Sequence, residues 1–278
     1  MDDRIGCNTL YPHGRLTDAA TQFDVAAHAA SLNLIADAGF DGCEFSHYEH
    51  LAEEDCVRVG DECRALGLEP WSAHSWVVLP KETSRVDEAL PRLRRAIEGA
   101  AALGASVMVV HAESWGASPG EDARRERRLA LETCLVGLEP YAITLGVKIA
   151  LENCSDGDDL RFLIRTVREL ALPCIGFTID TGHAVLRGID PAEAVSWMGD
   201  LLATTHLQDN DGARDDHLPP GCGSTVDWPR VLGALQKASY DGVYMVEISD
   251  CPAGREPDAA GDMQRAHDNL RSLLNHVR

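Results

Sequence analysis

The stretch that decides the fold is VKIALENCSDGDDLRFLIRTVRELALPCIGFTID, residues 147–180. It contains two short apolar runs, VKIALEN (147–153) and IGFTID (175–180), separated by a segment with apolar residues at helical spacing. Near-continuous apolar runs are typical of parallel strands that are buried on both faces, and a helix commonly connects such strands. The stretch therefore predicts one strand–helix–strand unit.

The same alternation extends over the rest of the chain. Eight units in 278 residues leave about 35 residues for each, which is enough for a strand and a helix. No glycine-rich phosphate loop follows the first apolar run, which disfavours a doubly wound sheet. We predict an α/β protein, a single (β/α)8 TIM barrel over residues 1–278. The other predicted strands are 5–9, 42–46, 69–75, 106–112, 201–209 and 242–249.

Glycines separate several predicted helices from the strands that follow them. A glycine just after a helix readily adopts the left-handed conformation that ends it. The longest irregular stretch, 209–226, follows the seventh strand and is predicted to be a functional loop. The glycines expected to end helices are Gly39, Gly67, Gly104 and Gly146.

The composition excludes several classes of protein. The formal charge of −20 repels nucleic-acid backbones, so we expect no nucleic-acid partner. No apolar run is long enough to span a bilayer, and the acidic start lacks a secretory signal. Nine scattered cysteines without a C-x-x-C motif predict reduced thiols rather than disulfides. We expect a cytoplasmic protein that does not contact membranes and that could form a homo-oligomer.

Six consecutive predicted strands end in an ionisable or imidazole side chain. In a (β/α)8 barrel the C-terminal strand ends meet at one rim, where the active site lies. One such residue alone is better explained by capping or by hydrogen bonding at the rim, but six together favour a functional site. These residues are His74, His111, Glu152, Asp180, His206 and Glu247.

Four of these residues predict a divalent metal site. Three carboxylates at one rim repel each other unless a cation lies between them. Carboxylates with one imidazole suit one ion of Mn²⁺, our first choice, or of Mg²⁺, Co²⁺ or Zn²⁺. Such an ion can bind a hydroxy-ketone and polarise its carbonyl. The predicted ligands are Glu152, Asp180, His206 and Glu247.

Further residues near these strand ends are candidates for contacts with substrate. His183 in DTGH and His217 in the long loop could bind substrate hydroxyls or a further metal, or could simply lie at the rim. Arg214 could pair with a carboxylate or phosphate, although an exposed loop arginine is the better-supported interpretation. Trp76 and Trp115 could cover the C–H face of a sugar or merely pack the loops. EDARRERR (121–128) predicts the solvated start of a helix, with a phosphate clamp as the minor alternative.

At these residues the sequence resembles the sugar phosphate isomerase/epimerase family, also called the xylose isomerase-like or AP endonuclease family 2 barrels. The matching motifs occur in order at strand ends and span nearly the whole chain. They are specific for the superfamily and weak for the substrate. The motifs are GCNTLY (6–11), ALEN (150–153), GFTIDTGHA (176–184), THLQD (205–209), HLPPGCGSTVDW (217–228) and GVYMVEIS (242–249).

The resemblance implies a sugar or sugar phosphate isomerase or epimerase of carbohydrate metabolism with a single metal. In the ketose 3-epimerase branch the two glutamates transfer protons on opposite faces of the sugar through a metal-bound enediolate, which here assigns that role to Glu152 and Glu247. The resemblance implies contacts with substrate for several of the histidines and for an arginine of the seventh loop. With Trp115 added from its position, the candidates for substrate binding are His74, His111, His183, His217, Arg214 and Trp115.

The same superfamily offers other activities. Dehydratases that act on a cyclitol or a related hydroxy-ketone share the scaffold and the metal site. Endonuclease IV holds three zinc ions, and its nine ligands are matched here by His74, His111, Glu152, Asp180, His183, His206, Asp215, His217 and Glu247. The acidic charge counts against this phosphoesterase, and a barrel that only binds metal is a further alternative. The expected partner is a small sugar, sugar phosphate or cyclitol.

Overall fold

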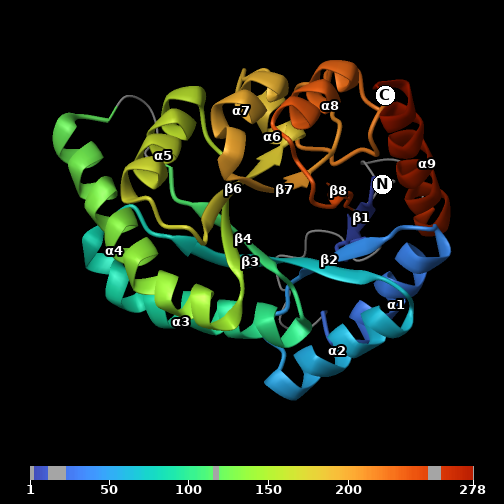
Figure 1. Cartoon of the computed structure of the whole chain (residues 1–278), viewed down its shortest axis with the longest axis horizontal. Helices are drawn as coiled ribbons and strands as arrows, with labels where there is room; N and C mark the ends of the chain where they lie inside the picture. The colour runs from blue at the N-terminus through green and yellow to red at the C-terminus, as the bar shows by residue number, and fades with distance from the viewer. Residues whose placement is uncertain (1–2, 12–22, 115–118, 250–257, 278) are drawn as a thin grey trace.

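The chain folds around a central sheet of eight parallel strands (Figure 1). The computed structural model describes residues 3–11, 23–114, 119–249 and 258–277. The strand order is β7-β6-β5-β4-β3-β2-β1-β8, so neighbours in sequence are neighbours in the sheet. The strands are β1 (Ile5–Asn8), β2 (Gly42–Ser46), β3 (Glu69–Leu79), β4 (Val107–Ala112), β5 (Lys148–Glu152), β6 (Ile175–Asp180), β7 (Leu202–His206) and β8 (Tyr244–Val246).

The sheet curves into a nearly closed barrel, because its two end strands also meet. Leu207, just after β7, forms a parallel bridge with Val246 of β8, and its backbone N–H donates to Met245 O at 2.8 Å. Together with the outer helices, this arrangement confirms the predicted TIM barrel.

Helices follow the strands and cover the outside of the barrel (Figure 1). Residues 209–226 contain neither helix nor strand, as the sequence predicted, but β7 ends three residues earlier than the predicted strand. The helices are α1 (Val25–Asp37), α2 (Glu53–Ala65), α3 (Val86–Leu103), α4 (Glu121–Leu145), α5 (Gly157–Leu170), α6 (Thr181–Leu186), α7 (Pro191–Met198), α8 (Trp228–Lys237) and α9 (Ala259–Val277), with 3-10 turns η2 (Thr83–Arg85) and η3 (Gly199–Leu201).

The glycines predicted to end helices do so. Gly104 and Gly146 are the C-terminal caps of α3 and α4, with φ of 86° and 69°. Gly39 and Gly67 lie just beyond α1 and α2 with φ of 85° and 82°. A side chain with a Cβ disfavours this left-handed conformation, so these four positions direct the chain from each helix into the next strand.

Alternating residues of the strands enter two apolar regions. Ile149 and Leu151 of β5 belong to the main core between the sheet and the helices. Ala150, on the same face of β5 as Glu152, belongs to a separate small cluster with Val107 and Ala203. This face thus carries a small apolar side chain two residues before the acidic group at the strand end.

Two further sequence expectations bear on the environment of the chain. In the part of the chain that the structure describes, no helix is both long and apolar enough to cross a membrane. The eight described cysteines are free, and Cys251 lies outside the described residues. Burial raises the pKa of the Cys7 and Cys43 thiols far above the usual range, which makes them unreactive.

The prediction of a solvated start for α4 is wrong at one residue. Most of 121–128 is exposed, but Arg127 is only 1% exposed and pairs with the equally buried Asp159 of α5 through both carboxylate oxygens. Burial lowers the pKa of Arg127 to about 10. The arginine run therefore contains a buried ion pair between two neighbouring helices.

Removing one partner of this pair should destabilise the protein. Asp159→Ala leaves the Arg127 guanidinium buried without this carboxylate, so we expect the free energy of unfolding to fall by about 3 kcal/mol in urea denaturation. The double variant Arg127→Met/Asp159→Leu should recover most of the loss. Arg125→Met is the matched control, because the Arg125–Asp122 pair is exposed and its loss should cost less than about 0.5 kcal/mol. Equal effects of Asp159→Ala and Arg125→Met would contradict the assignment.

Candidate metal centre

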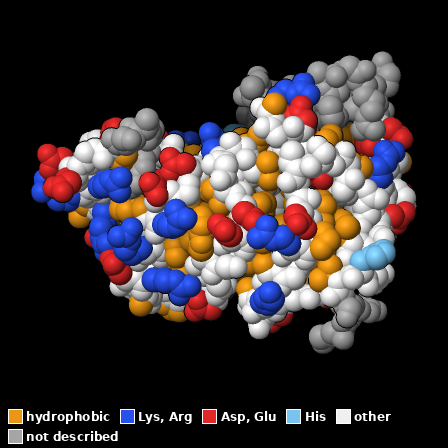
Figure 2. Space-filling model, turned by 90° about the horizontal axis from the view of Figure 1, so that it is seen from above, with side chains coloured by type: hydrophobic (Ala, Val, Ile, Leu, Met, Phe, Trp, Pro, Cys, Tyr) orange, Lys and Arg blue, Asp and Glu red, His pale blue; other side chains and the backbone are white. Residues whose placement is uncertain are grey.

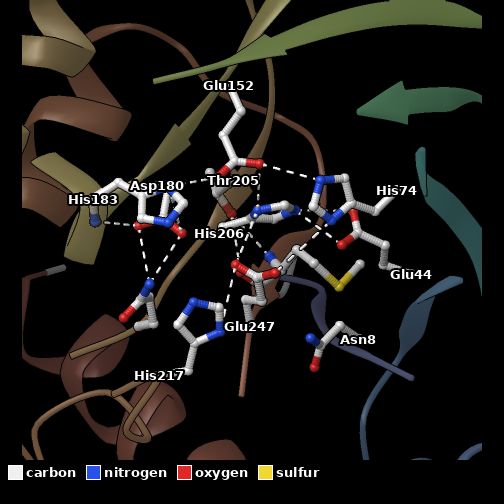
Figure 3. Close-up of polar contacts among 12 residues, drawn as sticks. Asn8, Glu44, His74, Glu152, Asp180, His183, Thr205, His206, His217 and Glu247 are labelled. Atoms are coloured by element: carbon white, nitrogen blue, oxygen red, sulfur yellow. Dashed lines mark hydrogen bonds and ion pairs between the residues drawn. The ribbon is translucent and has the colours of Figure 1, made fainter. Parts of the chain in front are cut away.

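The predicted rim residues converge on one site. Figure 3 shows five of them pointing toward one another: His74, Glu152, Asp180, His206 and Glu247. The sixth, His111, contacts Glu152. His74, His111, Glu152, Asp180 and His206 lie in β3 to β7, and Glu247 directly follows β8. His74, Glu152, Asp180, His206 and Glu247 are at most 3% exposed, and His111 is half-buried. Parallel strands thus deliver these side chains to a common point, as the barrel geometry requires.

Four of them form a group that can hold a metal ion. Glu152, Asp180, His206 and Glu247 each offer one ligand atom, and these atoms all lie within 4.8 Å of one another. His206 Nδ1 lies 3.3 Å from Glu152 Oε2 and 3.2 Å from Glu247 Oε2. This is the set that the sequence predicted as metal ligands.

The hydrogen bonding inside this group fits an ion. Among the described residues, Glu152 Oε1, His206 Nδ1 and Glu247 Oε2 are buried without a hydrogen-bond partner. A buried polar atom without a partner is costly, so these three atoms need either a proton or a cation between them. A divalent cation among them would satisfy all three, so the donor set fits a metal.

Two histidines flank the group on the β3 and β4 side. His111 Nε2 lies 3.2 Å from Glu152 Oε2 and 3.1 Å from His74 Nε2. Burial, together with the neighbouring His111, lowers the pKa of His74 to about 3. His74 is therefore a neutral imidazole with a lone pair available.

His183 and His217 flank the opposite side and share one carboxylate. His183 Nε2 and His217 Nε2 each lie 3.2 Å from Asp215, on different oxygens, and His183 Nδ1 lies 2.8 Å from Glu152 Oε1. His217 is buried with φ of 48°, a conformation that costs energy for a residue with a Cβ. Asp209 and Leu218 form an antiparallel bridge next to it, which holds this part of the loop in place.

Amide side chains fix the position of Asp180. Gln208 Nε2 donates to both carboxylate oxygens of Asp180 at 3.2 Å. Asn153 accepts from the Asp180 backbone N–H at 2.6 Å and donates to its backbone oxygen at 2.9 Å. The Asp180 carboxylate also caps α6 by accepting from His183 N–H. These contacts restrict Asp180 to one orientation.

The shifts in pKa indicate that the buried carboxylates need positive charge beside them. Burial raises the pKa of Asp180 to about 7, with Glu152 and Glu247 adding to the rise against the opposing effect of His183. Burial also acts to raise the pKa of Glu152, but His111 and His206 outweigh it and hold it well below its usual value. Burial acts to lower the pKa of His206, yet Glu247 and Glu44 raise it well above normal. Protonated imidazoles thus compensate the carboxylates when no cation does.

A cavity of about 160 Å³ opens onto the group. Trp76, 43% exposed, lines it with one face near His74 at a ring-centroid distance of 5.6 Å. Arg214 is not among the lining residues: its side chain is 63% exposed and pairs with Asp211 and Asp216. Trp115 lies outside the described residues. The cavity is lined by Leu10, His74, Trp76, His111, Glu152, His183, Asp215, His217 and Glu247.

Glu44 and Gln208 belong to the site but were not among the residues predicted from the sequence. Glu44 is fully buried in the middle of β2, and one of its oxygens lies 2.9 Å from His206 Nε2. A glutamate inside an otherwise apolar strand needs a polar partner, and this signal was present in GCEFS (42–46). Gln208 follows β7 and had no comparable signal.

Comparisons with known proteins agree with the barrel fold. A family model described as the xylose isomerase-like TIM barrel matches residues 32–273. Two solved structures superpose over nearly the whole chain. A D-tagatose 3-epimerase-like protein has a TM-score of 0.77 at 23% identity, covering 99% of this chain and 98% of its own. The 3-keto-D-glucoside 4-epimerase of E. coli has a TM-score of 0.74 at 22% identity, covering 98% and 100%.

The proteins that match by sequence give less information about function. An uncharacterised protein of Methanocaldococcus jannaschii is 29% identical over 240 residues, 78% of each chain. An inosose dehydratase of Lacticaseibacillus casei is 30% identical over 100 residues, 30% of this chain and 33% of its own. The resemblance stated from the sequence motifs is confirmed at the level of the family.

Metal binding at this group should release protons. The raised pKa of His206 means that a proton must leave before Nδ1 can bind an ion, so affinity should rise with pH, by about tenfold per pH unit for each proton displaced. Mn²⁺ titrations by calorimetry between about pH 6 and pH 8, in buffers of different ionisation enthalpy, measure both quantities. His276→Gln, at an exposed position of α9, is the control. Affinity that does not change with pH would contradict this charge state.

Proposed function

Because this chain belongs to the xylose isomerase-like TIM barrel family, we propose that it is a metal-dependent isomerase or epimerase of a small sugar or sugar phosphate. The observation that supports this most directly is the convergence of Glu152, Asp180, His206 and Glu247 next to a small cavity that Glu152 and Glu247 help to line. Similar structures include the epimerases named above. We further propose that residues 1–278 act as one domain, while the cytoplasmic location and a homo-oligomer stay predictions.

The proposed cofactor is one divalent ion, Mn²⁺ first, held by these four residues. When bound, such an ion draws electrons from a substrate carbonyl and so acidifies the neighbouring C–H. The protein supplies the rest: fixed carboxylates and side chains that orient the sugar. His183, His217, His74 and His111 surround the cavity and offer donors and acceptors for sugar hydroxyls.

Glu152 and Glu247 are the proposed acid and base. Both line the cavity, and they approach His206 from different sides, from β5 and from the end of β8 (Figure 3). One carboxylate removes the proton beside the carbonyl and becomes a carboxylic acid, leaving an enediolate. The other carboxyl group delivers a proton to the opposite face of the same carbon. This exchange inverts the centre, and protons equilibrate with solvent between turnovers.

Replacing either glutamate should separate proton exchange from epimerisation. At saturating Mn²⁺, we expect Glu152→Gln and Glu247→Gln to lower interconversion of ketose epimers by about 10²–10⁴-fold, because each retains shape but loses the proton carrier. In D₂O, each variant should still exchange deuterium into the one epimer that the remaining glutamate serves. Epimer ratios and deuterium content are measured by NMR over a panel of ketoses and their phosphates. The exposed Glu54→Gln is the control, and normal turnover of Glu152→Gln would refute its role.

Removing metal should lower stability as well as abolish activity. Ligand binding to the native state stabilises it by about 2.7 kcal/mol when metal is a hundredfold above Kd, and the carboxylates lose their counter-ion on chelation. We expect EDTA treatment to lower Tm by several degrees and reloading with Mn²⁺ to restore it. Asp180→Asn, which removes one ligand charge, should show a much smaller shift. An unchanged Tm after verified removal of metal would contradict the shared site.

Two alternatives have a specific observation in their favour. The match to an inosose dehydratase favours loss of a hydroxyl after the same proton removal, which would appear as the ultraviolet absorbance of an enone. The groups His74–His111–Glu152 and Asp180–His183–His217 could hold further ions, as a phosphoesterase like endonuclease IV requires. Three metal ions per chain and cleavage of abasic DNA would favour that enzyme over an epimerase.

A further inference from the structure

Glu44 is a buried carboxylate behind the proposed metal ligands. It is 0% exposed in the middle of β2. Ser72 Oγ of β3 donates to Glu44 Oε2 at 2.7 Å. His206 Nε2 lies 3.1 Å from Oε2 with hydrogen-bond geometry and 2.9 Å from Oε1. Among the ion pairs of the described residues, Glu44 has only His206 as its partner, so a single imidazole compensates this buried charge.

The two nitrogens of His206 face different surroundings. Nδ1 faces Glu152 and Glu247 at 3.3 and 3.2 Å, whereas Nε2 faces Glu44. Figure 3 shows Glu44 beyond the ring, away from Glu152. A neutral imidazole carries one N–H hydrogen, and a hydrogen-bond acceptor beside one ring nitrogen determines that this nitrogen carries it. A hydrogen on Nε2, donated to Glu44, leaves the Nδ1 lone pair directed at the proposed ion.

We propose that Glu44 is a positioning residue that orients His206 and fixes its Nε2–H tautomer for metal binding through Nδ1. This role rests on the metal site of the proposed function. A carboxylate hydrogen-bonded to the far nitrogen of a ligating histidine also makes the imidazole a stronger donor, since it stabilises the positive charge that develops on the ring. Glu44 thereby adds a negative charge to the site without occupying a ligand position.

The geometry distinguishes this role from direct ligation. Glu44, His74 and Glu247 also form a group that could hold an ion. However, Glu44 Oε2 already accepts from Ser72 and lies beside His206 Nε2, so binding an ion there would break the contact that holds His206. Glu44 is also absent from the residues that line the cavity. It therefore acts through His206 and does not touch substrate.

The test compares metal affinity and histidine tautomer in matched variants. Glu44→Gln keeps the shape but replaces the charged acceptor with a neutral one, and Glu44→Leu removes the acceptor. Ser72→Ala is the control, because it deletes the other partner of Glu44 and leaves His206 untouched. Dissociation constants are measured with Mn²⁺ and Zn²⁺ by competition against a chromophoric chelator, without substrate. The tautomer is measured by long-range ¹H–¹⁵N NMR of the Zn²⁺-loaded protein, with His206→Asn used for assignment.

We expect Glu44→Gln to weaken metal binding by about 10–100-fold, Glu44→Leu to weaken it further, and Ser72→Ala to have a smaller effect than either. The wild-type His206 should give the pattern of a ring protonated at Nε2 and metal-bound at Nδ1. If Glu44→Leu does not fold, Glu44→Gln decides the matter.

Three results would overturn the role. The first is unchanged affinity in Glu44→Gln, and the second is a wild-type His206 that binds metal through Nε2. The third is a Co²⁺-loaded Glu44→Gln whose visible spectrum shows the loss of a carboxylate ligand, which would make Glu44 a ligand itself. Intact metal binding without epimerase activity would overturn only the proposed reaction. Failure of the wild-type protein to bind a divalent metal would overturn both.

Discussion

The repulsion between buried carboxylates is the constraint on which the site depends. Glu44, Glu152, Asp180 and Glu247 are all at most 3% exposed, and burial in a low dielectric strengthens their mutual repulsion. His206 lies among them and contacts three. Neighbouring imidazoles and a bound cation are alternative ways to supply the positive charge. The side-chain amides of Asn153 and Gln208 hold Asp180 in place against the repulsion from the neighbouring carboxylates.

The register between neighbouring strands of the barrel determines the relative positions of these side chains. Asp180 of β6 pairs directly with His206 of β7, whereas Glu152 of β5 pairs with Thr178, two residues before Asp180. Similarly, His74 of β3 pairs with Val109, two residues before His111. The stagger between strands sets neighbouring ligands at different heights, and the long glutamate side chain spans the difference. A shift of one residue would turn each of these groups to the other face of its strand.

The sequence predicted the barrel and most of the convergent residues, because strand ends in a parallel barrel share one rim. It could not predict contacts that depend on which side of an element faces a neighbour. Arg127 looked solvated within a run of charges, but its helical position directs it to Asp159. Glu44 lies in the middle of a strand, where the rule of strand ends does not apply. Arg214 lies in the loop that the sequence predicts to be functional, yet its side chain forms an ion pair with Asp211, three residues earlier in the same loop.

The chemical role available to Glu152 depends on how many metal ions the site holds. It occurs in three of the groups that could hold an ion, with Oε1 near His183 at 2.8 Å and Oε2 near both His111 and His206. A carboxylate whose two oxygens both bind cations has a much lower proton affinity, so it is a poor base towards a C–H group. With one ion, one oxygen can bind the metal while the other faces the cavity as a base. A single-ion site therefore favours proton transfer beside a carbonyl. In a multi-ion site Glu152 would act as a metal ligand, as a phosphoesterase requires.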